Sequence, residues 1–304
     1  LPADGAPDEE ERGGGAVLMA HRGFGLARRG LLQRMATFLT MSKKTIVEFS
    51  RYPVAFVALF AQTFLIILMF LFAAFAFTAP GSGLAGGQQI AGVMVYGLII
   101  QLFLSFTLWE VGFSIREEQF RGTLESLYMS PASRFGSLIS RIFAILLWTS
   151  VMAVFAVLLV SLLVNGLPTA NFLLAMVVLL FTIFGLMGLG LIMAAITIRL
   201  KESAQFLVSF LQFFFIIFAA MFFPFGTLPD IMVDTVSRYL PVAYSVDAFR
   251  SLLLGLPAGF PELMPINLEI LIVVLFGLLA PPVSYLLYKE VERRARYQGT
   301  LGEY

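Results

Sequence analysis

The chain has 304 residues, of which 59% are hydrophobic and 13% are charged, and its formal net charge is +1. Soluble proteins carry about a quarter charged residues, so this composition excludes a soluble domain and indicates an all-α polytopic membrane protein. There is no cysteine and a single histidine, His21. Disulfides and thiolate metal sites are therefore excluded, and we expect neither a metal site nor a catalytic triad.

The N-terminal part divides into a tail and a helix. Residues 1–23 are acidic and glycine-rich and precede any long apolar run, so we expect a disordered cytoplasmic tail without a secretory signal. Residues 24–52 are expected to form an amphipathic helix along the cytoplasmic headgroups. Its apolar face is formed by Leu31, Met35, Phe38, Ser42, Ile46 and Phe49. The helix could be a simple membrane anchor or a contact site for a partner protein.

Six stretches are long and apolar enough to cross a bilayer core, which takes about 20 residues per helix. They are residues 53–78, 90–114, 138–164, 172–198, 204–223 and 266–288. Only Arg-Leu-Lys-Glu-Ser separates the fourth from the fifth, so these two are expected to form a helical hairpin. The six-span domain thus covers 53–288, and a cytoplasmic tail follows at 289–304.

The lysines and arginines orient the chain. All of them except Arg238 and Arg250 lie in the N-terminal segment, in the two loops that follow the second and fourth spans, or in the C-terminal tail. Cytoplasmic loops carry an excess of positive residues. We therefore expect both termini in the cytoplasm and the protein in the cytoplasmic (inner) membrane.

The predicted outer loops are short except for residues 224–265. There, proline and glycine interrupt two half-length amphipathic pieces, around 229–240 and 242–254. Neither piece can cross the bilayer. Backbone at membrane depth must be helical or buried in protein. We expect a broken helical hairpin that dips into or caps the outer leaflet before the last span.

Few ionisable groups lie within the spans. Glu110, near the cytoplasmic end of the second, and Glu269, near the outer end of the sixth, could each reach water or a headgroup. Without a midplane charge the chain has no evident ion-coupling device, which counts against a secondary transporter or cation channel. Deeper polar positions are Gln62, Gln101 and Gln212. These glutamines either form hydrogen bonds between helices or line a translocation path, in which Phe213 could offer an apolar surface.

The sequence REEQFRGTLESLYMSP, residues 116–131, is a charged island between the second and third spans. One helical stripe contains Phe120, Leu124, Leu127 and Tyr128. Glu117, Arg121 and Glu125 form i,i+4 pairs of opposite charge that support a short helix, and the Ser-Pro pair ends it. We expect a short amphipathic cytoplasmic helix that lies flat on the membrane or docks in a pocket of a partner.

Two motifs resemble those of one family. Residues Glu118 to Pro131, with Gly122, Thr123 and Glu125, resemble the signature loop of membrane permeases in the type-2 ABC exporter family. In the outer hairpin, PVAYSVDAFR resembles that family's motif before the last span. Its recurring residues are Pro241, Tyr244, Asp247 and Arg250. With the six spans and the N-terminal helix, the resemblance covers residues of about 25 to 290.

The resemblance implies that residues 116–131 are a coupling helix that docks on a separate ATP-hydrolysing subunit. The residues so assigned are Glu117, Glu118, Phe120, Arg121, Gly122, Thr123, Leu124, Glu125 and Pro131. It also implies a second copy of the permease and two ATPases, which hold ATP and Mg. Spans one, two and five would line the path, and the outer short helices would form a gate or a cap. For Asp247 and Arg250 the alternative is an i,i+3 surface ion pair.

The chain has no Gly-x-x-x-x-Gly-Lys-Ser/Thr loop, so we expect it to bind no ATP through such a loop and to be no enzyme itself. The expected function is export of an amphipathic or hydrophobic substrate, such as a drug, a lipid or a lipid-linked molecule. Export of a polysaccharide or lipid-linked glycan is the alternative. A membrane-embedded enzyme and a non-transporting scaffold are less favoured. The expected partners are the ATPase, a second copy and membrane lipid, with no nucleic acid.

Overall fold

The computed structural model describes residue 47 and residues 53–77, 83–113, 134–163, 165–200 and 203–297. These residues form helices, turns and loops without a strand, which confirms the all-α prediction for them. In chain order the α-helices are α2 (Pro53–Phe77), α3 (Gly83–Phe106), α6 (Arg134–Leu163), α7 (Phe172–Leu200), α8 (Ala204–Phe218), α9 (Asp230–Thr235), α10 (Pro241–Leu254) and α11 (Ile266–Tyr297).

Four of the described helices, namely α3, α6, α7 and α11, are long and apolar enough to cross a membrane. The apolar segments found in α2 and α8 are shorter, at Phe60–Met69 and Ala204–Phe218. The described helices therefore make the chain an integral membrane protein, and the count of six spans stays a prediction.

The predicted fifth span, 204–223, ends earlier than its hydropathy indicates. α8 stops at Phe218, and Ala220 has a positive φ of 46°, so the backbone leaves the helical direction there. A helix of 15 residues rises about 22 Å, which is less than the roughly 30 Å of a bilayer core. By contrast, the last helix extends past the predicted end at residue 288 and continues to Tyr297.

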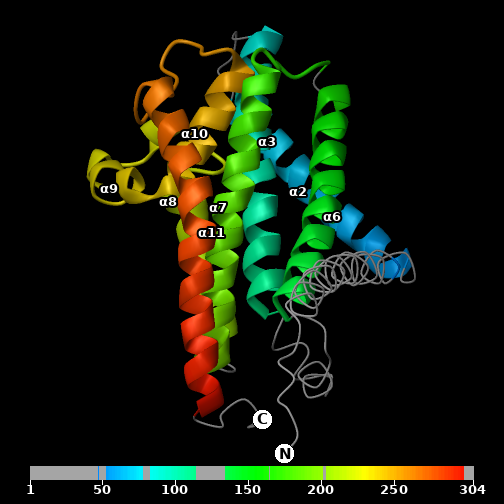
Figure 1. Cartoon of the computed structure of the whole chain (residues 1–304). Coiled ribbons are helices and arrows are strands. Elements are labelled where there is room, and N and C mark those ends of the chain that lie inside the picture. The colour runs from blue at the N-terminus through cyan, green and yellow to red at the C-terminus, as the bar shows by residue number, and fades with distance from the viewer. Residues whose placement is uncertain are drawn as a thin grey trace, which may run out of the picture.

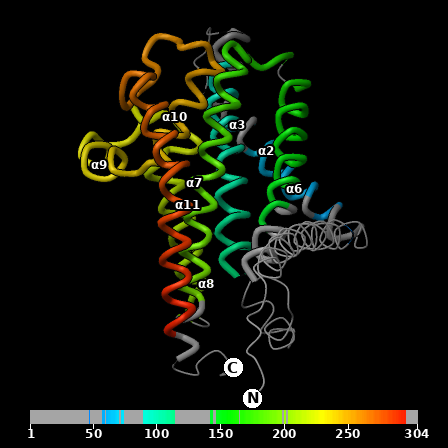
Figure 2. The backbone as a smooth tube through the Cα atoms, viewed as in Figure 1, coloured from blue at the N-terminus to red at the C-terminus, as the bar shows by residue number. Residues whose placement is uncertain are grey.

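The two helices α7 and α11 lie side by side along most of their length (Figure 1). Glycines permit this close approach. A Cβ at Gly185 would fall 2.1 Å from the Phe276 ring, and one at Gly277 would fall 2.5 Å from the carbonyl oxygen of Phe181. Small residues at helix contacts are the usual device for packing helices in membranes. Figure 2 shows α3 behind this pair and α6 at the far side of the bundle.

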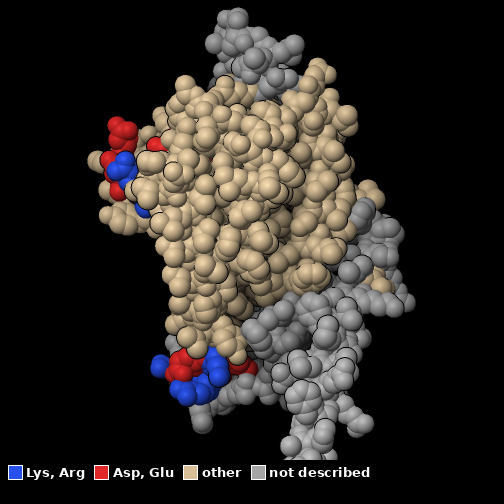
Figure 3. Space-filling model, turned by 45° about the horizontal axis from the view of Figure 1, so that its top comes forward, with Lys and Arg blue, Asp and Glu red and all other residues tan. Residues whose placement is uncertain are grey.

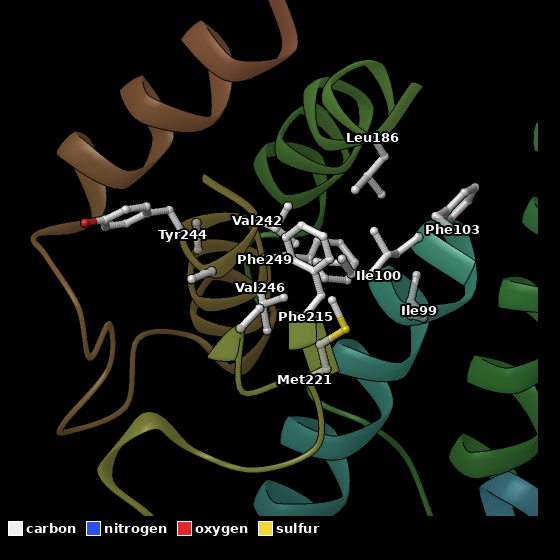
Figure 4. Close-up of a cluster of buried hydrophobic side chains, with 14 of the residues drawn as sticks. Ile99, Ile100, Phe103, Leu186, Phe215, Met221, Val242, Tyr244, Val246 and Phe249 are labelled. Carbon is white, nitrogen blue, oxygen red and sulfur yellow. The ribbon is translucent and has the colours of Figure 1, made fainter. Parts of the chain in front are cut away.

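Helix α10 lies at the centre of the largest apolar core. Every residue from Val242 to Leu253 is buried, so the helix is covered on all sides. Figure 4 shows Val242, Val246 and Phe249 converging with side chains of α3 and of the α8 end. The side chains from those two elements are Ile99, Ile100, Phe103, Phe215 and Met221. α10 is thus enclosed by the ends of the longer helices.

On the face seen in Figure 3, the charged side chains of the described residues gather in small areas. Figure 3 shows two groups of them separated by a broad uncharged surface. The ion pairs in these areas include Asp234 with Arg238, beside α9, and Glu290 with Arg293 and Arg294, near the end of α11. The sides of the long helices between these places expose Leu, Val and Phe. A lateral surface of this kind suits lipid.

Candidate functional site

The predicted coupling helix, residues 116–131, lies outside the described residues, so its site residues stay predictions. The N-terminal helix at 24–52 lies outside them too, apart from Val47, which is exposed. The helical segments on both sides of the coupling loop are described. The second span stays helical to Phe113, and α6 begins at Arg134.

A polar contact joins α3 to α8. The Trp109 indole Nε1 donates a hydrogen bond to Oε1 of Gln212 at 2.7 Å, and Nε2 of Gln212 donates to Oγ of Ser105 at 3.1 Å. Trp109 belongs to a π-helical turn, Thr107–Val111, that interrupts the second span. Such turns are rare and are frequently found at functional sites. The inserted residue changes the direction in which the side chains after Phe106 point.

The surface around this contact is aromatic. Trp109 stacks on Phe113 with ring centroids 5.6 Å apart and an angle of 16° between the planes. It remains 37% exposed, and Phe213, next to Gln212, is 64% exposed. Phe206 and Phe210 of α8 are exposed as well. We use the name aromatic face for the Trp109–Gln212 contact together with the exposed phenylalanines of the same helix α8, Phe206, Phe210 and Phe213.

The four predicted path residues have different surroundings. Gln212 and Phe213 lie on the aromatic face. Gln101 lies one turn before Ser105 on α3, is buried, and has an Oε1 atom without a hydrogen-bond partner. Gln62 is exposed on α2 and makes no described hydrogen bond to the others. Of the four predicted path residues, Gln212 therefore makes the contact between α3 and α8, and no described hydrogen bond joins Gln101 or Gln62 to it.

The outer motif forms a second polar site, on α10. Pro241 occupies the first turn of the helix, where its missing N–H costs nothing. Tyr244 is buried, and its hydroxyl end points away from the other labelled core side chains (Figure 4). The hydroxyl donates a hydrogen bond to the carbonyl oxygen of Arg238 at 2.8 Å. This bond holds the 3₁₀ turn Ser237–Tyr239 against the start of α10.

Arg250 is fully buried and binds backbone carbonyls just after α8. Its Nη2 donates to the oxygens of Ala220 at 2.8 Å and Met221 at 3.1 Å, and its Nη1 donates to Phe223 at 3.2 Å. Burial lowers the pKa of Arg250 to about 10, and the carboxylates of Asp247 and Glu262 oppose this shift. The guanidinium is therefore still charged at neutral pH.

Asp247 is also fully buried and binds the loop that precedes α11. Its Oδ2 accepts hydrogen bonds from the backbone N–H groups of Glu262 at 2.8 Å and Leu263 at 2.9 Å. The alternative of an i,i+3 surface ion pair between Asp247 and Arg250 is wrong. Neither side chain reaches the surface, and the described hydrogen bonds of each go mainly to backbone groups in two separate loops.

The two glutamates of the predicted spans differ in their exposure. Glu110 is exposed in the π-helical turn, as expected. The expectation that Glu269 could reach water or a headgroup is wrong, because the residue is fully buried. Its Oε1 accepts a hydrogen bond from the backbone N–H of Met264 at 3.1 Å. Glu269 thus caps the loop that leads into its own helix.

The model of the ABC-2 type transporter family matches residues 36–254, which is well over half of the chain. The chain belongs to the ABC-2 type transporter family. This confirms the resemblance on which the two motifs were assigned. No curated protein was found to match the sequence.

Membership makes the chain the transmembrane component of an ABC-2 type transporter. Permeases of this family work with an ABC ATPase, which is the general kind of partner expected here. They are typically not catalytic themselves. The matched residues include both the predicted coupling segment and the outer motif.

Several residues of this ABC-2 permease were not found from its sequence. Ser105 and Trp109 follow Gln101 at intervals of four residues, a polar stripe that the sequence displays. The hydrogen bond from Trp109 to Gln212 depends on the π-helical turn, and no pattern in the sequence predicted that turn. Gly97 is equally inconspicuous, yet a Cβ there would fall 1.6 Å from the carbonyl oxygen of Met221.

Proposed function

We propose that the chain is the permease of an ATP-driven exporter that moves an amphipathic or hydrophobic substrate across the cytoplasmic membrane. A drug, a lipid or a lipid-linked molecule would fit. A separate ATPase subunit supplies the energy and holds ATP and Mg. The permease acts as a pair of chains bound to two such subunits, with both termini in the cytoplasm.

The scarcity of ionisable groups supports an external source of energy. In the apolar stretches of the long described helices, the acidic residues are Glu110, which is exposed, and Glu269, which binds its own loop. Asp247 of the short helix α10 is buried too, but it binds the backbone N–H groups of Glu262 and Leu263. Ion-coupled carriers rely on ionisable groups near the midplane. The charge distribution of the described part of the chain favours a permease driven through its cytoplasmic loop, as family membership implies.

The observation that carries the choice of substrate is the aromatic face. Trp109, Phe213 and the other exposed phenylalanines of α8 offer a large apolar surface. Gln212 and Ser105 add a few groups that can exchange hydrogen bonds. Ligand sites for amphipathic molecules combine an apolar lining with a few placed polar groups. A glycan would call for many more polar groups than the described residues of this face supply, so glycan export is the second choice.

The first test of the function is copurification. The chain is isolated from the membranes of its own host in mild detergent, and the proteins bound to it are identified by mass spectrometry. We expect a stoichiometric ATPase that is lost from Glu118→Ala and Glu125→Ala, because these residues lie in the segment assigned to coupling. Glu290→Ala is the matched control, since Glu290 is an exposed glutamate of α11 that is paired with Arg293 and Arg294. A chain that purifies without an ATPase would favour the scaffold or enzyme alternatives.

The second test is transport in inverted membrane vesicles that contain the chain and its ATPase. We expect ATP-dependent uptake of an amphipathic dye or lipid probe. Trp109→Phe removes the donor to Gln212 but keeps an aromatic ring, and it should raise the KM by about two-fold to ten-fold, the effect of one lost hydrogen bond. Trp148→Phe is the control, because Trp148 lies on α6. Uptake of a lipid-linked glycan in place of the dye would select the alternative substrate.

A further inference from the structure

The chain just after α8 presents carbonyl groups that have to be satisfied away from water. α8 ends at Phe218, and the buried residues Ala219 to Met221 follow it as a turn. Carbonyls that leave a helix inside a membrane protein need donors from the protein itself. Arg250 donates to Ala220, Met221 and Phe223, and its positive charge lies at the negative end of the α8 dipole.

The same short helix binds the opposite loop. One turn before Arg250, Asp247 accepts hydrogen bonds from the N–H groups of Glu262 and Leu263, just ahead of α11. A further bond links the two loops directly, because Oε2 of Glu262 accepts a hydrogen bond from the N–H of Gly226 at 3.0 Å. Glu269 ties the end of this loop to the first turn of α11. The end of α8 and the start of α11 are therefore both bound to α10.

A third helix completes the arrangement. α3 presents Gly97 to this point, and its missing side chain leaves room for the Met221 carbonyl and for Nη2 of Arg250. The ring of Tyr96 packs edge-on against Phe249 of α10, with centroids 6.0 Å apart. α2 and α6, in contrast, pack mainly against α3 and against each other.

We propose that Asp247 and Arg250 are positioning residues that make α10 a rigid bridge between the end of α8 and the start of α11. The outer ends of these two helices then move as one unit during transport. The role of this unit as part of an outer gate rests on the proposed function, whereas its rigidity is a property of the chain alone. Arg250 is the key residue, because it alone of the described side chains binds the three carbonyls at the end of α8.

The absence of cysteine permits a direct measurement of this rigidity. Spin labels are attached to Ile217→Cys on α8 and Leu268→Cys on α11, which are 45% and 49% exposed. The distribution of distances between them is measured by pulsed EPR on the full chain in lipid nanodiscs. We expect a narrow distribution. In Arg250→Ala its width should rise roughly two-fold, because the chain after α8 loses its contacts with α10.

Arg238→Ala is the matched control. Arg238 belongs to the same hairpin, but its side chain is half exposed and pairs with Asp234 at 3.0 Å, so the distribution should stay narrow. A second label pair at Leu180 and Leu287, both exposed on α7 and α11, reports the rest of the bundle and should stay unchanged in Arg250→Ala. An unchanged width for the first pair in Arg250→Ala would overturn the proposal, and so would equal broadening of both pairs.

If Arg250→Ala does not accumulate as folded protein, the same EPR measurement is made on Arg250→Lys. Lysine keeps the charge but loses the planar fork that reaches three carbonyls. We expect intermediate broadening for the first pair, and a width like that of the wild type would overturn the bridge. Transport is measured separately in vesicles. Absence of transport in the wild type would contradict the proposed function while leaving the EPR result on rigidity intact.

Discussion

The outer end of the molecule and the aromatic face use polar groups in opposite ways. Around α10 the charged groups Asp247 and Arg250 are fully buried, and each binds backbone groups of a separate loop. On the aromatic face the polar groups of Trp109 and Gln212 belong to partly exposed, uncharged side chains that bind each other. Buried charges without partners are costly, so the first arrangement tolerates little change. The second can exchange its bonds with another molecule.

This contrast separates a part of the permease that fixes geometry from a part that can bind. It predicts large losses of stability and little selectivity for substitutions around α10. For the aromatic face it predicts small losses of stability and clear effects on substrate. Each substitution below tests one side of that division.

The largest effect is expected at Gly97. In Gly97→Ala the new Cβ would fall 1.6 Å from the Met221 carbonyl oxygen, and backbone cannot move aside as a flexible side chain can. We expect a loss of more than about 4 kcal/mol, in the range reserved for severe core disruption. Gly226→Ala is the control, because a Cβ at Gly226 would have no neighbouring atom within 4 Å. Thermal unfolding in detergent compares the two, and equal midpoints would contradict the close contact of α3 with the end of α8.

Asp247→Ala comes next. It removes the acceptor of two backbone N–H groups and takes from the buried Arg250 the carboxylate that favours its charge most. Breaking a buried charge network costs about 3 kcal/mol or more. Asp234→Ala removes an exposed partner of Arg238 and should cost less than about 1 kcal/mol. Similar unfolding midpoints for the two variants would mean that the buried network contributes no more than a surface pair.

The sequence predicted the long helices well and the ends of two of them poorly. Apolar runs identify α3, α6, α7 and α11 because bilayer thickness fixes the length of such runs. The run of α8 continues through residues 219–223, all apolar, so hydropathy conceals the turn at Ala220. The partners of Arg250 are backbone carbonyls, which have no sequence signature. From the sequence, the spacing of three residues between Asp247 and Arg250 therefore indicated a surface ion pair as one alternative.

The sequence displays the outer motif, but it did not predict the contacts that each of its residues makes. Pro241, Tyr244, Asp247 and Arg250 recur every third residue, which turns them around the helix. Side chains that point to different sides of a helix can all bind other parts of the protein only if the helix is buried on all sides. That burial comes from the packing of α3, α7 and α11 around α10, and no local pattern specifies it.

Tyr244→Phe should have a moderate effect. It deletes the hydroxyl that donates to the Arg238 carbonyl at 2.8 Å and keeps the ring. A single neutral hydrogen bond contributes about 1 kcal/mol to stability. Unfolding midpoints of Tyr244→Phe and of Tyr239→Phe give the comparison, since Tyr239 is 81% exposed. A loss no greater than that of Tyr239→Phe would show that the 3₁₀ turn is held by packing alone.

The smallest loss of stability is expected for Ser105→Ala, which removes the acceptor of the Gln212 amide at 3.1 Å. Because this bond is only half buried, the cost should be below about 1 kcal/mol. The Gln212 amide, which accepts the hydrogen bond of Trp109, then loses its own bond to Ser105, so the indole should move more freely. In a Trp148→Phe background Trp109 is the only tryptophan, and its fluorescence anisotropy decay measures that motion directly. Faster decay at nearly unchanged stability would place this contact among the adaptable parts of the permease. An unfolding midpoint lowered as far as in Asp247→Ala would instead make it a second rigid element and remove the contrast between the two regions.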